Sequence, residues 1–364
     1  MNKIKTLIAV GGTGGHVFPG LNLADHLKDL DYNVHIITDN RGHIFLSELN
    51  NIKITKLPSS PINRKNIFSL FLSVIFIFYS ILRSTIFLLF NRPKIIFGMG
   101  GYASFPLCFA AIILRIKFII YENNLIVGKS NKYLLPFAEK IFVSHKEING
   151  ISKRYNHKIT KIGNIIKKSI LNFSQIKRKK IFSKKLSILI LGGSQAAKIF
   201  AETLPSIFQR CSEQGLNLKV FQHCLPYQEE ELSNFYEKAK IEYETFNFSK
   251  DLTDYFSKVN LAITRSGASM LAELTNANIP FISIPLPTSA ENHQLINATF
   301  YQKKKLAFLI EEKDLSENLF KLIKRIHTNE DLLNEIIKNQ SQYSDKNVYK
   351  YINEDLKKLF NEKN

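Results

Sequence analysis

Short apolar runs alternate with longer segments of helical periodicity over most of the chain. In the first half we expect strands at residues 4–10, 33–38, 52–57, 94–97, 118–121, 140–143 and 159–162. The alternation restarts later, with strands expected at residues 186–191, 217–221, 241–246, 261–264, 281–284 and 307–310. Strands that alternate with helices are typical of a parallel sheet covered by helices. The pattern predicts an α/β protein with two doubly wound, Rossmann-like domains that face a cleft.

A basic, irregular stretch at residues 164–185 separates the two patterns, and we interpret it as the linker between domains. A length of 364 residues also favours two domains over one. We therefore expect an N-terminal domain at residues 1–163 and a C-terminal domain at residues 186–335. Residues 336–364 have a helical, polar pattern, and we expect this helix to pack back on the first domain.

One segment of the first half, Ile67–Phe90, is almost wholly apolar, with Arg83 as its only charged residue. Its length would allow a membrane span. However, it lies between two strands of one alternating pattern, and a span would put the two parts of that sheet on opposite sides of a bilayer. We expect a helix that is partly core and partly inserted in the membrane interface. A fully buried core helix remains the alternative.

The charge of the chain points to an anionic partner. Lys and Arg number 50 against 31 Asp and Glu, which gives a formal net charge of +19. No basic module interleaved with aromatic residues is present, so we expect an anionic membrane surface rather than a nucleic acid. Basic residues also flank or interrupt the apolar segment, where they can meet anionic headgroups: Arg64, Lys65, Arg83, Arg92 and Lys94.

The N-terminus and the cysteines indicate a cytoplasmic protein. The first apolar run ends at Gly11, too early for the hydrophobic region of a signal peptide. The three cysteines show no C-x-x-C pairing, which fits a reducing compartment and argues against structural zinc. No metal-ligand spacing occurs elsewhere, and we expect neither a metal nor a cofactor.

The first strand leads into a loop with four glycines in five positions, Gly11-Gly12-Thr13-Gly14-Gly15, followed by His16. Strand, glycine loop and helix in this order can hold an anion on the first N–H groups of the helix. The dinucleotide fingerprint fails because Val17 stands where its third glycine is needed, and no P-loop lysine follows. The alternative is a tight turn with a surface histidine.

A second loop of the same kind, with Gly100, Gly101 and Tyr102, follows the strand at residues 94–97. The carboxyl ends of parallel strands share one edge, so both loops can touch one diphosphate. Glu122, Asn123 and Asn124 follow the next strand, where sites also form.

The second domain repeats this design, with Gly192-Gly193-Ser194-Gln195 after its first strand. Arg265-Ser266-Gly267-Ala268 after a later strand opens a helix whose N–H groups suit a diphosphate. Glu273 on this helix can accept hydrogen bonds from both hydroxyls of a ribose. The alternative is an ordinary carboxylate on the helix surface. Glu291-Asn292-His293-Gln294 offers amide and imidazole groups suited to sugar hydroxyls.

Taken in order, these motifs resemble the MurG family over essentially the full chain. This resemblance implies the GT-B fold and a bacterial N-acetylglucosaminyltransferase that converts lipid I to lipid II in peptidoglycan synthesis. The enzyme would be peripheral at the cytoplasmic face of the inner membrane, with UDP-N-acetylglucosamine and lipid I as substrates and the cell-wall and division machinery as possible partners. The implied transfer is inverting: the 4-hydroxyl of N-acetylmuramic acid attacks C1 of the donor sugar, and UDP leaves.

The resemblance also implies roles for individual residues. His16 is the first candidate for the general base, and Glu122 is the second catalytic candidate. The acceptor diphosphate is expected at Gly12, Gly100, Gly101 and Tyr102. Glu273 would bind the ribose of uridine, and Gln294 would recognise the donor sugar. The donor site as a whole is expected at Thr13, Gly14, Gly15, Asn124, Lys167, Ser194, Ala268, Ser269, Met270, Leu271, Ala272, Glu273, Asn292 and Gln294.

Two departures from the family pattern concern the donor site. Lys167 stands where the family usually has arginine. Lysine keeps the positive charge but lacks the bidentate guanidinium fork that suits phosphate. Ala196 replaces the last glycine of a Gly-Gly-Ser-Gln-Gly loop. The alternatives that remain are a UDP-N-acetylglucosamine 2-epimerase, another lipid-directed GT-B glycosyltransferase, and a membrane-associated scaffold that has lost catalysis.

Overall fold

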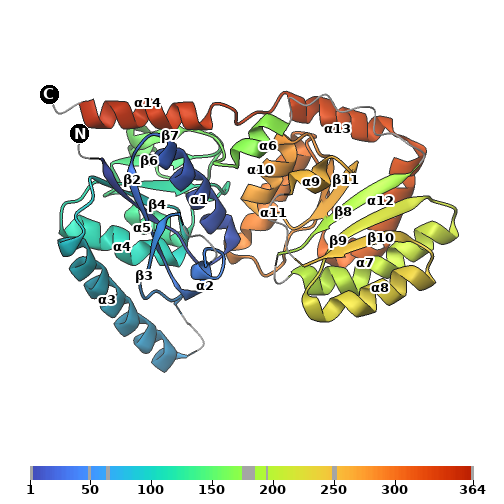
Figure 1. The fold of residues 1–364 in the computed structure, drawn as a ribbon, viewed down its shortest axis with the longest axis horizontal. Helices are drawn as coiled ribbons and strands as arrows, with labels where there is room; N and C mark the ends of the chain where they lie inside the picture. The colour runs from blue at the N-terminus through green and yellow to red at the C-terminus, as the bar shows by residue number, and fades with distance from the viewer. Residues whose placement is uncertain are drawn as a thin grey trace. The chain divides into compact units, whose positions relative to one another are not determined.

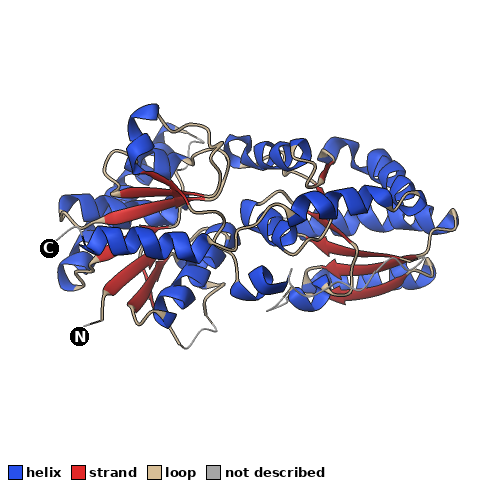
Figure 2. Ribbon diagram, turned by 90° about the horizontal axis from the view of Figure 1, so that it is seen from above, coloured by secondary structure: helices blue, strands red, loops and turns tan. Residues whose placement is uncertain are grey.

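The computed structural model describes residues 3–47, 51–62, 66–173, 185–193, 196–247 and 252–361. The chain forms two compact α/β units (Figure 1). Unit 1 comprises Met1–Lys167 and Asp345–Asn364, and unit 2 comprises Lys168–Ser344. Each unit has one sheet with helices packed against it (Figure 2).

The sheet of unit 1 has the order β3-β2-β1-β4-β5-β6-β7, and each pair of neighbouring strands is parallel. Its strands are β1 (Lys5–Ala9), β2 (Asn33–Thr38), β3 (Lys53–Lys56), β4 (Ile95–Gly98), β5 (Phe118–Glu122), β6 (Lys140–Val143) and β7 (Ile159–Lys161). The helices are α1 (Gly14–Asp29), α2 (Asn40–His43), α3 (Ile67–Phe90), α4 (Gly101–Ile113), α5 (Lys129–Leu134) and α14 (Val348–Asn361), with a 3-10 helix at Lys153–Lys158.

The sheet of unit 2 has the order β10-β9-β8-β11-β12-β13 and is also parallel throughout. Its strands are β8 (Leu186–Leu191), β9 (Leu218–His223), β10 (Glu242–Phe246), β11 (Leu261–Thr264), β12 (Phe281–Ser283) and β13 (Phe308–Leu309). Its α-helices are α6 (Lys168–Phe173), α7 (Ala196–Glu213), α8 (Glu229–Lys238), α9 (Thr253–Phe256), α10 (Ala268–Asn276), α11 (His293–Lys303), α12 (Leu315–Thr328) and α13 (Asp331–Ser341). Short 3-10 helices lie at Pro226–Gln228, Ala290–Asn292 and Glu312–Asp314.

The predicted α/β fold with two parallel sheets is confirmed, and every predicted strand is present. The ends differ by at most two residues, as at 217–221 against Leu218–His223. The central strands were the most predictable because they are buried on both faces: the four residues of β4 and the five of β5 are all buried. The division between units falls after Lys167 and again after Ser344, so α13 belongs to unit 2 and α14 to unit 1.

Helix α3 has the reverse of the usual arrangement for a helix that covers a sheet. Its buried residues are Ser80, Ser84 and Leu88, whereas most of its large apolar side chains are exposed. Phe68 and Phe90, near its two ends, are 70% and 83% exposed. The serine face packs against α4, and α3 lies on the outer side of that helix (Figure 1). The alternative of a fully buried core helix is therefore wrong.

Candidate active site

Two glycine loops meet at the point where the strand order of unit 1 reverses. β1 and β4 are neighbours, but the chain leaves β1 toward β2 on one side and leaves β4 toward β5 on the other. Ligands of open α/β sheets bind at the carboxyl ends of strands at such a switch point. α1 begins at Gly14 and α4 at Gly101, soon after these strands, and neither N-cap residue, Thr13 or Gly100, makes a side-chain cap.

His16 is held between the two loops. Its Nδ1 lies 3.0 Å from the backbone oxygen of Met99. A carbonyl oxygen can only accept, so Nδ1 carries a hydrogen, and in the neutral form of the ring the lone pair is then on Nε2. This tautomer gives His16 the atom that a general base requires.

The second loop needs glycine because the His16 ring lies against it. Gly100 and Gly101 have φ of +92° and +72°, which residues other than glycine rarely adopt. A Cβ atom on Gly100 would also lie 3.1 Å from Cε1 and Nδ1 of His16. The glycines therefore let the backbone approach the imidazole closely.

Glu122 is 3% exposed at the end of β5, and both of its carboxylate oxygens accept hydrogen bonds from the chain. Oε1 accepts from the backbone N (3.2 Å) and Nδ2 (3.0 Å) of Asn124. Oε2 accepts from the backbone N of Gly128 (2.9 Å) and Nδ2 of Asn131 (3.0 Å). With four such donors, we interpret Glu122 as a positioning residue rather than as a group that exchanges protons with substrate.

The neighbouring Asn123 joins this end of β5 to α1, since its Nδ2 donates to the backbone oxygen of Gly15 over 3.0 Å. Asn131, which the sequence analysis did not single out, donates from Nδ2 to the backbone oxygen of Tyr121 and to Oε2 of Glu122. Its position on α5 gave no signal in the sequence, because the partners lie nine and ten residues away across a loop.

Asp39 is a second residue that the sequence reasoning missed. It follows β2 and is 3% exposed. Its Oδ1 accepts from the backbone N of Gly12 (3.1 Å) and of Gly42 (2.8 Å). The Gly12 amide is thus already engaged within the chain, which differs from its predicted role with the acceptor diphosphate. A polar residue directly after a strand was the signal that could have found it.

Unit 2 has the same reversal of strand order, between β8 and β11. Gly192 and Gly193 follow β8, and Arg265, Ser266 and Gly267 follow β11. The predicted donor residue Ser194 lies outside the described residues. The N-cap residue of α10 is Gly267, which has no side chain to cap the helix, and the first-turn N–H groups point to the same edge of the sheet.

The predicted donor residues on α10 divide into two groups. Leu271 and Ala272 are fully buried and Ala268 is 7% exposed, so these side chains belong to the core. Ser269, Met270 and Glu273 are half-buried. Only the second group, together with backbone N–H groups of the first turn, can reach a ligand through this helix.

Gln294 fixes the loops around this helix start. Its Oε1 accepts from the backbone N of Ser266 (3.1 Å) and of Leu286 (3.0 Å). The amide nitrogen is the group of this side chain that remains for a sugar. Asn292 is exposed at the start of α11 with φ of +57°.

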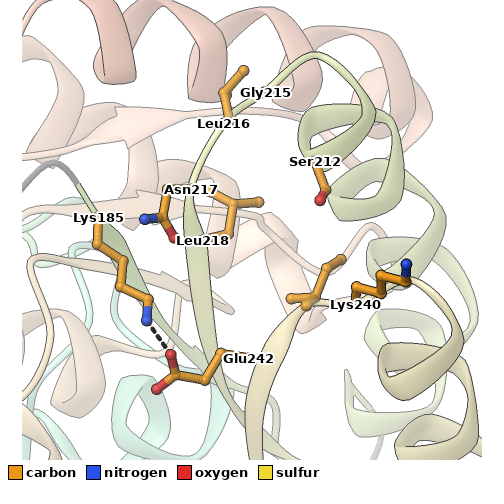
Figure 3. Close-up of a pocket in the computed structure, with 9 residues that line it drawn as sticks. Lys185, Ser212, Gly215, Leu216, Asn217, Leu218, Lys240 and Glu242 are labelled. Atoms are coloured by element: carbon orange, nitrogen blue, oxygen red, sulfur yellow. Dashed lines mark hydrogen bonds and ion pairs between the residues drawn. The ribbon is translucent and has the colours of Figure 1, made fainter.

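The pocket in Figure 3 lies at the opposite edge of the same sheet, near the starts of β8, β9 and β10. Its volume is about 350 Å³, and the Lys185 ammonium at its rim is paired with Glu242. It is remote from the carboxyl ends of the strands, so we do not assign the reaction to it. Within the described ranges, no three His, Cys, Asp or Glu side chains are grouped as metal ligands.

Comparison with known proteins identifies the family of the chain. Residues 6–143 match the glycosyltransferase family 28 N-terminal domain, and residues 187–352 match the C-terminal domain of that family. A UDP-N-acetylglucosamine–N-acetylmuramyl-(pentapeptide) pyrophosphoryl-undecaprenol N-acetylglucosamine transferase of Pelagibacter ubique is 36% identical over 368 residues, covering 100% of both chains. The protein of that name from Rickettsia canadensis is 32% identical and covers 93% of this chain and 96% of its own. The chain belongs to this family of transferases.

Solved structures support the fold of the family. MurG of Acinetobacter baumannii has a TM-score of 0.74 at 23% identity and covers 96% of this chain and 98% of its own. A UDP-GlcNAc 2-epimerase from Neisseria meningitidis, bound to UDP-GlcNAc, has a TM-score of 0.68 at 13% identity and covers 98% and 100%. At these identities, the likeness shows the shared architecture alone.

Membership of the transferase family makes this chain a glycosyltransferase. The described structure brings Gly14, Gly15, His16, Gly100, Gly101 and Tyr102 to one edge of unit 1. Lys167 is exposed at the last position of the first segment of unit 1. The roles of these residues toward donor and acceptor remain predictions.

Proposed function

We propose that this chain transfers N-acetylglucosamine from UDP-N-acetylglucosamine to the 4-hydroxyl of N-acetylmuramic acid in lipid I, with inversion at C1. The observation that carries the proposal is the 36% identity over the whole chain to a relative with this named activity. The two loops at the switch point of unit 1 and the uncapped start of α10 in unit 2 provide suitable anion sites.

In the proposed reaction, Nε2 of His16 takes the proton of the attacking hydroxyl. A bond forms between that oxygen and C1 of the donor sugar, while the bond from C1 to the diphosphate oxygen breaks and UDP leaves. N–H groups at the start of α10 stabilise the charge that develops on the leaving diphosphate. Glu122 acts indirectly, because it fixes Asn124 and Asn131 beside the loops.

We further propose that the enzyme is peripheral at the cytoplasmic face of the membrane and binds it through α3. Among the described helices, α3 alone is long and apolar enough to cross a bilayer. It connects β3 and β4, which belong to one sheet, so insertion along the interface fits better than a span. Arg83, Arg92 and Lys94 are exposed on or near it and can meet anionic headgroups, while Arg64 and Lys65 lie outside the described residues.

The test is an assay with labelled UDP-N-acetylglucosamine, with and without a lipid I analogue. Label in the lipid product supports the proposal. Formation of the 2-epimer from the donor alone would instead identify an epimerase. A chain that yields neither product would contradict both enzymatic hypotheses.

A further inference from the structure

A hydrogen-bonded series of three side chains leads from the first glycine loop to the surface of unit 1. The hydroxyl of Tyr102 donates to Oδ2 of Asp39 over 3.0 Å. Nη1 of Arg41 donates to the Tyr102 oxygen over 3.3 Å. Asp39 is buried, Tyr102 half-buried and Arg41 exposed.

The direction of each hydrogen bond is fixed by chemistry. A carboxylate only accepts and a guanidinium only donates, so the tyrosine hydroxyl donates to Asp39 and accepts from Arg41. Burial, followed by the charge of Asp39, raises the pKa of Tyr102 and keeps this hydroxyl protonated. The series therefore holds the guanidinium beside the loop in a defined position.

The buried carboxylate of Asp39 reduces the positive potential that the first glycine loop offers to an anion. The amide of Gly12 is engaged by Asp39, and the carboxylate of Asp39 adds a negative charge behind the loop. A cation at this edge would offset the charge of Asp39 for an anionic ligand, and Arg41 is exposed next to Tyr102. The adjacent residue Asn40 lines a pocket of about 240 Å³ together with Lys56. This pocket offers space for a ligand beside Arg41, and Lys56 adds a second positive charge.

We propose that Arg41 binds the diphosphate of the acceptor, and that Asp39 positions it through the hydroxyl of Tyr102. This inference rests on the proposed function, since it assigns a residue to the acceptor of that reaction. A guanidinium matches phosphate oxygens with two parallel N–H bonds, which gives both affinity and orientation.

The test compares steady-state kinetics of Arg41→Ala with wild type on a lipid I analogue. We expect the KM for the acceptor to rise about tenfold or more, the loss expected for a charged hydrogen bond. Arg41→Lys should recover part of the loss, because it keeps the charge without the fork. The control is Lys117→Met. Lys117 directly precedes β5, at the amino end of the strands and away from the loops, so this variant removes one positive charge and should retain the wild-type KM.

Two further arms separate binding from a merely structural effect. Arg41→Ala should have no added effect on an acceptor in which an uncharged linker replaces the diphosphate. Tyr102→Phe and Arg41→Ala should be non-additive in the double variant, since both interrupt one series. An unchanged KM in Arg41→Ala, or an equal loss on both acceptors, would overturn the inference while the transfer itself stands. A wild-type chain without transfer would overturn the proposed function, and this inference with it.

Discussion

At the scale of single residues, His16 is the group closest to the proposed chemistry. The carbonyl of Met99 sets its tautomer, and two glycines with positive φ leave space for its ring. These partners come from a distant loop, since His16 and Met99 are 83 positions apart. The sequence predicted the loop and the histidine but not this contact.

We expect His16→Ala to lower kcat by about 10²–10⁴, the usual contribution of a positioned general base. UDP binding should be nearly unchanged, because we do not assign the ring to a uridine site. Turnover and UDP affinity, measured on the same preparation, check this prediction. His157→Ala, at an exposed site, is the control. Wild-type turnover in His16→Ala would remove His16 from the chemistry.

A second residue-scale prediction concerns pH. Burial, with the charges of Lys53 and Lys5, lowers the pKa of His35 to about 4. An unfolded histidine titrates near about 6.5. Between these values the unfolded chain binds a proton that the folded chain does not, so stability is present above about pH 6.5 and falls toward pH 4.

Urea unfolding at several pH values checks this prediction. His35→Gln should give a flatter dependence of the free energy of unfolding on pH over that window, whereas His157→Gln should keep the wild-type dependence. Equal slopes for wild type and His35→Gln would show that His35 does not titrate as described.

At the scale of elements, α3 shows what the pattern could and could not reveal. The sequence analysis recognised the apolar length of α3 but did not identify its buried face. Its inner face carries Ser69, Ser73, Ser80 and Ser84, which are spaced to lie along one side of a helix. This serine stripe was visible in the sequence and indicates a helix whose apolar side faces outward.

We expect Phe71→Ser with Phe78→Ser to weaken binding to vesicles that contain anionic lipid, because both rings are exposed on α3 at 60% and 69%. Co-sedimentation with vesicles is the measurement. Tyr227→Ser removes an aromatic ring with 72% exposure from unit 2 and serves as the matched control. Equal binding of the double variant and wild type would contradict the role of α3.

Helix α14 returns the end of the chain to unit 1. The Tyr349 hydroxyl donates to the backbone oxygen of Ile166 over 2.7 Å in a buried site. Tyr349→Phe should cost about 1–3 kcal/mol in the free energy of unfolding, since a buried carbonyl loses its donor. Tyr351→Phe, on the same helix at 39% exposure, should change little. Equal urea midpoints for the two variants would show that the buried hydrogen bond does not stabilise the fold.

At the scale of the whole molecule, the sheets were the most predictable part. Parallel strands that are buried on both faces leave continuous apolar runs, and the glycine loops follow at their carboxyl ends. The contacts among Asp39, Gly12 and Tyr102 were not predictable, because they join residues 27 and 63 positions apart. The sequence therefore predicted which loops form the candidate site, and the structure shows which of their groups are engaged within the chain.

The most direct test of the proposed transfer measures two products in one reaction with labelled UDP-N-acetylglucosamine and a lipid I analogue. We predict that UDP release requires the acceptor, and that each UDP is matched by one N-acetylglucosamine in the lipid product. UDP release without sugar in the lipid, or no UDP release with the acceptor present, would contradict the proposed function.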